Sequence, residues 1–438
     1  MKLFGSSGIR GLVNKDVDAK LAMAVGNSVG SLYGNIVLGH DTRASYAMLS
    51  SALTAGALLS GSRVSDAGLV PTPTLACSTK KFDCGIMVTA SHNPPDYNGI
   101  KLWNPDGSSF DTAQMENVES AVLAQKLKKV GWRELRPVER HGTALREHTE
   151  KILASVERAN LKVVVDCLNG ATSVVTPYVL MRMGCDVITL NADPDGSFHG
   201  RTPEPTEENL EDLKSMVRGA KAHLGIAHDG DGDRVVAVDE RGRYVDGDRL
   251  LALFSSVEAV KNIVIPFDSS MAIEDHLRHV TVHRCRVGDV FVSETIKRTG
   301  SDFGGEPSGT FIFPKFSMGP DGIFAAAKLV ELVKKDPLSR HMARLPSYPV
   351  MKTSVSFQGS KKEKVMREVM ESVEAIRSQG LEKMDGIKLI FENSWALVRF
   401  SGTEPKVRIT VEARTKGAAK TTFQKVSSAV KRAVGKAR

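Results

Sequence analysis

The chain has 438 residues, 41% hydrophobic and 25% charged, a length and composition that predict several globular domains and not one core. Its formal net charge is +8, but aromatic residues make up only 6% and basic residues are spread along the sequence, which favours a small anionic ligand over nucleic acid. No apolar run is long enough to span a membrane, and five scattered cysteines without a CxxC pair argue against a zinc site or a disulfide framework. We therefore expect a cytoplasmic protein with reduced thiols and neither a membrane nor a nucleic-acid partner.

The first part of the chain alternates between predicted strands and helices. Hydrophobic periodicity and turn residues give, in order, a glycine-rich segment at 4–11, a helix around 21–29, a strand and turn at 36–43, a helix over about 45–60, and strands opening at 61–64 and 84–88. The same order recurs twice. The second pass has a strand and turn at 163–170, a strand at 184–188 and a strand running into 229–234. The third begins with the corresponding segment 263–270 and has a strand at 279–282 before the polar loop 304–309.

This weak repeat predicts three tandem, related α/β domains, each with a parallel βαβ element. After a proline-containing linker at 345–349 the pattern changes to strands at 353–357, 387–391, 396–400 and 407–411, with helices near 363–378 and at the end. Such a succession predicts an α+β domain with a mainly antiparallel sheet. The predicted domains are 1–140, 141–247, 248–345 and 346–438.

Ser91 follows the predicted strand 84–88, in a loop that ends in Pro94 and Pro95. Open α/β sheets place their chemistry at the ends of strands, so Ser91 is a candidate nucleophile, although a turn residue fits the loop equally well. Lys101 lies nearby and is a candidate general base if its pKa is lowered. His92 has either a catalytic or a packing role.

Asp229, Asp231 and Asp233 alternate with glycines between two predicted strands. Alternating carboxylates around flexible backbone suit a hard cation such as Mg²⁺ or Ca²⁺. An EF-hand is excluded because Arg234 stands where its glycine is required and the flanks are strands. An acidic hairpin turn is the alternative, and Arg234 suggests a place where metal and anion meet.

Two further loops carry polar groups. The segment 399–405 and Arg408 supply arginines, hydroxyls and loop N–H groups that fit a phosphate, although a polar hairpin is as good an explanation. Glu306 and Ser308, in the tight loop 305–310, suit the hydroxyls of a sugar. Neither a P-loop nor a dinucleotide fingerprint is present in the sequence.

Taken together, these loops resemble the α-D-phosphohexomutase family, and the resemblance covers the whole chain. It is carried most specifically by residues 89–94 and 229–234, with support from 4–11, 195–198, 203–206 and 399–405. The family has four domains around a central active-site cleft, and the first three share an α/β topology. That agrees with the repeat found independently in the sequence.

The resemblance implies an isomerase of carbohydrate metabolism that works through a phosphoserine. Ser91 would carry the phosphoryl group and, with Asp229, Asp231 and Asp233, would hold one Mg²⁺. Lys101 would be the general base, helped by His92, and Arg10 and Arg234 would stabilise the transferring group. Glu306 and Ser308 would hold the sugar. The non-reacting phosphate would be bound by Arg399, Ser401, Gly402, Thr403 and Arg408.

The expected reaction moves phosphate between O6 and O1 of a hexose through a 1,6-bisphosphate, which also acts as activator. Residues 286–289 and 305–310 look most like archaeal-type phosphoglucosamine mutases, which convert glucosamine 6-phosphate to glucosamine 1-phosphate. Archaeal phosphomannomutase/phosphoglucomutases are the alternative, ahead of a Mg²⁺-dependent sugar phosphatase or a non-catalytic sugar-phosphate binder. Thr310 stands where many members have histidine, and Phe400 where proline is common. The oligomeric state stays open.

Overall fold

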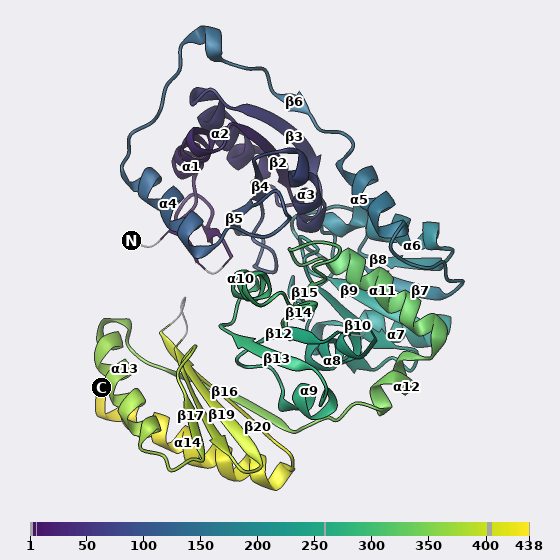
Figure 1. Ribbon diagram of the computed structural model, residues 1–438, viewed down its shortest axis with the longest axis vertical. Helices are drawn as coiled ribbons and strands as arrows, with labels where there is room; N and C mark the ends of the chain where they lie inside the picture. The colour runs from purple at the N-terminus through teal and green to yellow at the C-terminus, as the bar shows by residue number, and fades with distance from the viewer. Residues whose placement is uncertain (1–2, 6, 258–259, 401–404, 438) are drawn as a thin grey trace. The chain divides into compact units, whose positions relative to one another are not determined.

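Figure 1 shows the computed structural model of the chain, in which residues 3–5, 7–257, 260–400 and 405–437 are described. The chain divides into two compact units. One unit comprises Met1–Val264 and Gly288–Arg344, and the other comprises Ile265–Val287 and Leu345–Arg438. Among the described residues, no helix has both the length and the apolar character that crossing a membrane requires.

The first sheet has the strand order β1-β5-β4-β2-β3-β6. Its strands are β1 (Ile9–Leu12), β2 (Asn35–His40), β3 (Arg63–Leu69), β4 (Cys84–Val88), β5 (Tyr97–Trp103) and β6 (Glu139–Arg140). Strand β2 runs parallel to β3 and β4, whereas β5 is antiparallel to both β4 and β1. The expected parallel element is therefore present, extended by antiparallel strands that the repeat did not predict.

Helices cover both faces of this sheet because its strand residues alternate in direction. Ile36 and Leu38 pack toward one face, and Val37 packs toward the other. The first face is covered by α1 (Ala19–Leu32), α2 (Tyr46–Leu59) and α4 (Thr112–Leu123), and the second by α3 (Thr72–Ser78) and α5 (Ala144–Leu153). The predicted helix over about 45–60 is confirmed as α2.

The second sheet has the order β11-β10-β9-β7-β8. Its strands are β7 (Lys162–Asp166), β8 (Asp186–Leu190), β9 (Leu224–His228), β10 (Val235–Asp239) and β11 (Tyr244–Val245). Strand β7 is parallel to β8 and β9, and β9 and β10 form an antiparallel hairpin. Helix α7 (Glu211–Ala220) packs on one face of the sheet. Helix α6 (Thr176–Met183) contacts β8, and α11 (Gly322–Lys335) contacts β9 and β10. The hairpin places the predicted acidic loop between the carboxyl end of β9 and the start of β10.

The third sheet has the order β13-β12-β14-β15. Its strands are β12 (Asn262–Pro266), β13 (Thr281–Cys285), β14 (Phe303–Gly305) and β15 (Phe311–Ile312). Strands β12 and β14 are parallel, and β14 and β15 are antiparallel, so the predicted sugar loop connects a hairpin. The associated helices are α8 (Gly247–Val257), α9 (Met271–His276), α10 (Asp289–Thr299) and α12 (Leu338–Ala343). Short 3-10 helices complete the chain at Thr79–Lys81, Trp132–Glu134, Ala171–Val174, Glu207–Asn209 and Gly359–Lys361.

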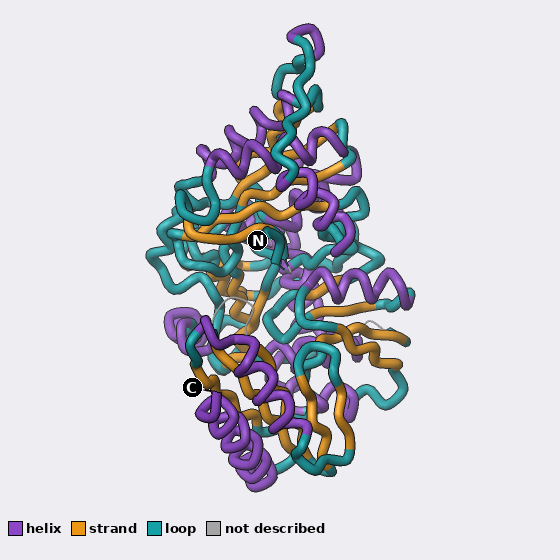
Figure 2. The backbone as a smooth tube through the Cα atoms, turned by 90° about the vertical axis from the view of Figure 1, so that its left-hand side faces the viewer, coloured by secondary structure: helices purple, strands orange, loops and turns teal. Residues whose placement is uncertain are grey.

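The fourth sheet is antiparallel throughout, as predicted, with the order β16-β20-β19-β18-β17. Its strands are β16 (Val350–Ser356), β17 (Gly380–Glu382), β18 (Ile387–Phe391), β19 (Ser394–Phe400) and β20 (Lys406–Ala413). Helices α13 (Lys362–Glu374) and α14 (Lys416–Ala437) lie side by side against one face (Figures 1 and 2). Phe267 and Met271 pack with Trp395 and Leu397, which ties the segment Ile265–Val287 to this sheet.

Candidate active site

Ser91 lies in the loop that follows β4, at the carboxyl end of that strand, where the sequence placed it. Its backbone has a φ of 51°, in the left-handed region that residues with a side chain seldom adopt. The Ser91 N–H donates to Thr89 Oγ1 at 2.9 Å, and the Ser91 hydroxyl donates to Asp229 Oδ2 at 2.6 Å. The loop conformation therefore points the buried hydroxyl at the acidic loop of the second sheet.

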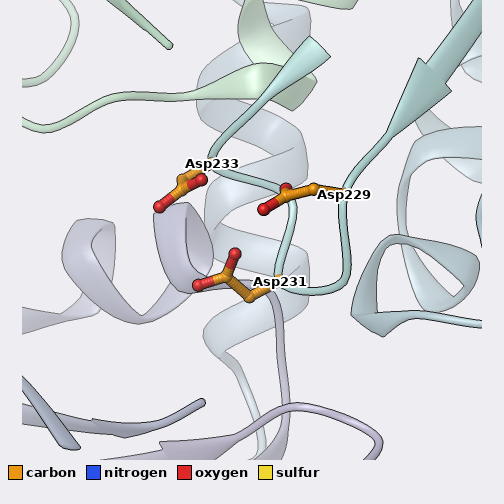
Figure 3. Close-up of side chains that lie close together, drawn as sticks. All are labelled: Asp229, Asp231 and Asp233. Atoms are coloured by element: carbon orange, nitrogen blue, oxygen red, sulfur yellow. The ribbon is translucent and has the colours of Figure 1, made fainter. Parts of the chain in front are cut away.

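The acidic loop brings three carboxylates together at the turn between β9 and β10 (Figure 3). Asp229, Asp231 and Asp233 are all buried, and each offers an oxygen within 4.8 Å of the others. Oδ1 of Asp231 and Oδ1 of Asp233 have no hydrogen-bond partner in the described part of the chain. Buried carboxylate oxygens without partners are costly, and a hard divalent cation is the ligand that such a donor set fits.

Lys101 lies on β5, where it pairs with Met87 of the neighbouring strand β4. Its ammonium group lies 2.9 Å from Asp231 Oδ2 and 2.7 Å from Asp233 Oδ2. Burial alone lowers the pKa of Lys101, but these two carboxylates outweigh burial and raise it above the ordinary value. The sequence made Lys101 a candidate general base only if its pKa is lowered. The pKa is raised instead, so Lys101 is held as a cation.

The three aspartates have different proton affinities. Burial, together with repulsion from its two neighbours, raises the pKa of Asp229 well above its usual range, and burial and Asp231 also raise the pKa of Asp233. Burial acts on Asp231 as well, but the Lys101 ammonium and the Thr72 hydroxyl outweigh it and lower the pKa of that carboxyl. Repulsion among the three carboxylates contributes to the raised pKa values of Asp229 and Asp233, and a bound cation would relieve it.

Three further candidates surround the serine. His92 Nδ1 lies 3.3 Å from Ser91 Oγ, and burial with the nearby arginines lowers the pKa of His92 to about 2, so its ring is neutral. Arg10 Nη1 donates to Asn93 Oδ1 at 2.8 Å. Arg234 Nη1 lies 3.5 Å from Glu204 Oε1, while Arg234 Nε has no hydrogen-bond partner among the described residues. The structure therefore brings positive charge to the serine and leaves part of it available to an anion.

The loop after β14 lies against the acidic loop. Thr310 forms an antiparallel bridge with Arg234, and Gly309 accepts a hydrogen bond from the Val235 N–H at 3.0 Å. Glu306 accepts hydrogen bonds from the Gly288 N–H at 2.8 Å and from Thr310 Oγ1 at 3.1 Å. Thr310, in the position where the sequence departs from the family pattern, orients the carboxylate of Glu306.

Ser308 Oγ is buried and has no hydrogen-bond partner among the described residues. A hydroxyl in this state is available to a polar ligand. Together with Glu306, it places two groups for hydroxyl recognition on the loop that contacts the acidic loop. The predicted sugar loop and metal loop therefore belong to one assembly of side chains.

The remaining predicted residues belong to the second unit. Arg399, on β19, lies opposite Arg408 of β20 in the antiparallel register. The Arg399 guanidinium is 3.0 Å from Asp385 Oδ2 and 4.0 Å from Asp268 Oδ2, and its Nε has no hydrogen-bond partner within the described residues. The other three predicted phosphate ligands lie outside the described residues: Ser401, Gly402 and Thr403.

Thr72 is a site residue that the sequence did not single out. Its hydroxyl donates to Asp231 Oδ2 at 2.6 Å, and its N–H donates to the Asp231 carbonyl at 2.8 Å. It stands at the start of α3, next to Pro71, in a position typical of an ordinary helix start. Nothing local marked its contact, because Asp231 lies 159 residues away in the sequence.

Family models match the chain from one end to the other. The model for phosphoglucomutase/phosphomannomutase, alpha/beta/alpha domain I, matches residues 1–129, and those for domains II and III match 143–242 and 246–348. The model for the C-terminal domain matches residues 358–429. The fold and these matches define a phosphohexomutase, an enzyme of the isomerase class.

Related proteins are similar over nearly their whole length. A probable phosphoglucosamine mutase of Methanocella arvoryzae is 48% identical over 99% of both chains, and the phosphoglucosamine mutase of Methanocaldococcus jannaschii is 40% identical over 99% of both. A crystal structure of a phosphoglucomutase/phosphomannomutase family protein from Burkholderia thailandensis matches 99% of this chain and 97% of its own, with a TM-score of 0.88 and 27% identity. The chain belongs to the phosphoglucomutase/phosphomannomutase family.

Proposed function

We propose that this phosphohexomutase interconverts glucosamine 6-phosphate and glucosamine 1-phosphate, with Ser91 as the phosphoryl carrier. The observation that carries the proposal is the 2.6 Å hydrogen bond from Ser91 Oγ to Asp229 within a cluster of three buried carboxylates. A serine hydroxyl beside a hard-cation site is the arrangement that phosphoryl transfer needs, because catalysis there depends on positioning and charge neutralisation.

Asp229, Asp231 and Asp233 would hold one Mg²⁺ together with Ser91. The unpartnered oxygens of Asp231 and Asp233 support this set, since hard oxygen ligands suit magnesium. When bound, the ion neutralises negative charge on the phosphoryl group. Thr72 and the backbone N–H groups of Gly232 and Arg234 hold the carboxylates in place.

Two transfers account for the isomerisation. In the first, the bond from phosphorus to Ser91 Oγ breaks as a bond to the free hydroxyl oxygen of the sugar forms, and the proton of that hydroxyl passes to a base. The product is a hexose 1,6-bisphosphate. In the second, a bond forms between Ser91 Oγ and the other phosphorus as the bond from that phosphorus to its sugar oxygen breaks. The proton held by the base passes to that sugar oxygen, so the phosphoserine is regenerated and the isomer is released. The bisphosphate therefore serves as both intermediate and activator.

Arg10 and Arg234 supply positive charge to the transferring group, and the neutral ring of His92 lies beside Ser91, with Nδ1 3.3 Å from Ser91 Oγ. Lys101, protonated beside Asp231 and Asp233, contributes positive charge to the site. It becomes the general base only when a cation takes up the charge of Asp231 and Asp233, because these two carboxylates are what raise its pKa. Glu306 and Ser308 bind sugar hydroxyls, and Arg399, Ser401, Gly402, Thr403 and Arg408 bind the phosphate that does not react.

The choice of glucosamine rests on the names of the relatives, at 40–49% identity. Mannose and glucose phosphates are the second candidates, because the family models and the Burkholderia structure carry those names. The test is to compare kcat/KM for glucosamine, mannose and glucose 6-phosphates, with Mg²⁺ and a trace of the matching bisphosphate. A higher value for mannose or glucose phosphate than for glucosamine phosphate refutes the substrate assignment.

The same assay separates a mutase from a phosphatase. A mutase converts 6-phosphate to 1-phosphate with total sugar phosphate unchanged, which ³¹P NMR follows directly. Release of inorganic phosphate without any 1-phosphate would identify a phosphatase, in which water takes the group from Ser91. Intact mass measurement tests the carrier itself: one phosphate is expected on the wild type and none on Ser91→Ala, and a wild type that is never phosphorylated would indicate a binding protein.

A further inference from the structure

Arg43 lies completely buried beneath the loop that carries Ser91. It follows β2 and is far from that loop in the sequence. All five of its N–H groups have acceptors: one donates to Asp41 and four donate to loop carbonyls. The four carbonyl contacts are Ser91 O at 2.8 Å, Asn93 O at 2.6 Å, Pro94 O at 2.6 Å and Tyr97 O at 2.8 Å.

Asp41 connects Arg43 to the N–H side of Ser91 through Thr89. Its Oδ2 lies 3.1 Å from Arg43 Nε and accepts a hydrogen bond from Thr89 Oγ1 at 2.6 Å. Thr89 Oγ1 in turn accepts the hydrogen bond of the Ser91 N–H. Both backbone groups of Ser91 are therefore connected to the Arg43–Asp41 pair, directly at the carbonyl and through Thr89 at the N–H.

Ser91 needs this support because its left-handed backbone conformation is unfavourable for a residue with a side chain. Pro94 and Pro95 stiffen the end of the loop but supply no N–H donor that could hold it. A guanidinium group has five donors in a fixed planar fork, which suits several carbonyls at once. The conformation that aims the Ser91 hydroxyl at Asp229 is thus supported by a residue from the segment that follows β2.

Phe198 covers the outer side of Arg43, with the guanidinium carbon 5.0 Å from the ring centroid. The backbone at Gly196 approaches the backbone at Arg43 so closely that a Cβ on Gly196 would lie 2.4 Å from the Arg43 Cα. The same ring reaches the acidic loop: a Cβ on Gly230 would lie 3.4 Å from Phe198 Cζ and 2.7 Å from Ser91 O. Arg43 and Phe198 therefore connect the serine loop with the metal loop.

We propose that Arg43 is the positioning residue of the phosphoryl carrier, and that Phe198 sets this support in register with the acidic loop. The inference rests on the proposed role of Ser91. Arg43 has no exposed surface and does not touch the reacting atoms, so it acts only through the loop that it holds. Its loss should affect the rate of transfer and not the binding of the sugar, which Glu306 and Ser308 serve.

Arg43→Lys tests the proposal because lysine retains the charge opposite Asp41 but cannot span four carbonyls. We expect kcat to fall by about 10²-fold, the cost typical of a small misplacement of reacting groups, while KM changes by less than about threefold. Arg243→Lys is the matched control. Arg243 also pairs with a buried aspartate, Asp239, at 2.7 Å, but in the β10–β11 hairpin. The control should retain kcat.

Hydrogen exchange supplies a readout that does not depend on activity. In Arg43→Lys, the amides of Ser91, Asn93 and Tyr97 should exchange faster than in the wild type, and in Arg243→Lys they should not. If the wild type exchanges as expected but shows no mutase activity, the proposed function fails while the positioning role stands. Wild-type kcat in a folded Arg43→Lys, or unchanged exchange in the loop, would overturn the positioning role.

Phe198→Leu keeps the inference testable if Arg43→Lys does not fold. The variant leaves every hydrogen bond of Arg43 in place and removes only the ring face, so we expect a fall in kcat of about threefold to tenfold, with KM unchanged, from the loss of one cation–π contact. Faster exchange at Ser91 should accompany it. A folded Phe198→Leu with wild-type kcat and exchange would show that the ring does not position the loop.

Discussion

The charged groups around Ser91 in the first unit and those around Arg399 in the second unit differ in how far water reaches them. Around Ser91, Lys101 is only 6% exposed and its two carboxylate partners are at most 6% exposed, so the charges are fixed and shielded from water. Arg399 is 27% exposed and pairs with a partly exposed Asp385. Buried pairs are costly to break, whereas partly exposed pairs exchange partners at low cost. The first arrangement suits chemistry, and the second suits a phosphate that binds and leaves.

Ser91→Ala should have the largest effect on turnover, because it removes the proposed phosphoryl carrier from the buried group of charges around Lys101. We expect turnover to fall by about 10⁴-fold or more, as for loss of a nucleophile in other enzymes. The measurement is conversion of glucosamine 6-phosphate by ³¹P NMR, with intact mass for the phosphoserine. Ser120→Ala, at an exposed serine of α4, is the control. Turnover within tenfold of the wild type would place the carrier elsewhere.

Asp231→Asn should cost about 10²- to 10³-fold in turnover at a fixed, low Mg²⁺ concentration. The substitution removes one charge from the cation site and one partner from Lys101. Turnover should be measured across a Mg²⁺ titration, and the concentration that gives half-maximal activity should rise. Asp186→Asn on β8, where the aspartate is exposed, should behave like the wild type. An unchanged magnesium requirement would contradict the metal assignment.

Arg399→Lys tests the second unit. A bidentate guanidinium is replaced by a point charge, so one charge-assisted hydrogen bond to phosphate should be lost, worth roughly 1.5–3 kcal/mol. We expect KM for the sugar phosphate to rise by about tenfold to a hundredfold, with a smaller change in kcat. Arg414→Lys, at an ion pair with Asp275 in the same unit, controls for loss of an arginine. A change confined to kcat would mean that Arg399 serves the chemistry instead.

Lys388 gives the smallest predicted effect, one on stability. Burial lowers its pKa to about 8, and its ammonium lies 4.4 Å from the centroid of the Trp395 ring and donates to Phe267 O. Because the unfolded chain binds this proton more tightly, the cost to folding is complete below pH 8 and disappears as the pH rises toward 10.5. The free energy of unfolding should therefore increase by roughly 1–2 kcal/mol between pH 7.5 and 9.5.

Urea unfolding at the two pH values, followed by tryptophan fluorescence, measures this increase. Lys388→Met should abolish the contribution, because no group at that position then titrates. Lys425→Met, at a lysine of α14 that lies over the Phe391 ring of β18, should leave it intact. Equal pH dependence in the wild type and Lys388→Met would show that Lys388 is not the source.

Local patterns predicted the parts of the site that are contiguous in the sequence. The alternation of Asp229, Asp231 and Asp233 with glycines between two strands was sufficient to predict a converging acidic loop. The apolar run before Ser91 placed the serine at a strand end, and the repeated order of elements predicted the α/β architecture. The antiparallel extensions of the sheets were not predicted, since a repeat of βαβ units contains no information about added edge strands.

The roles of Ser91 and Lys101 required contacts between distant segments. The sequence by itself determined which loops are polar, which strands precede them and that hard-cation ligands are present. Only the tertiary structure showed that Thr72 holds Asp231, that Lys101 is kept protonated by the carboxylates beside it, and that Arg43 holds the Ser91 loop. The reason is physical: a pKa and a strained backbone are set by neighbours in space, and those neighbours come from segments distant in the sequence.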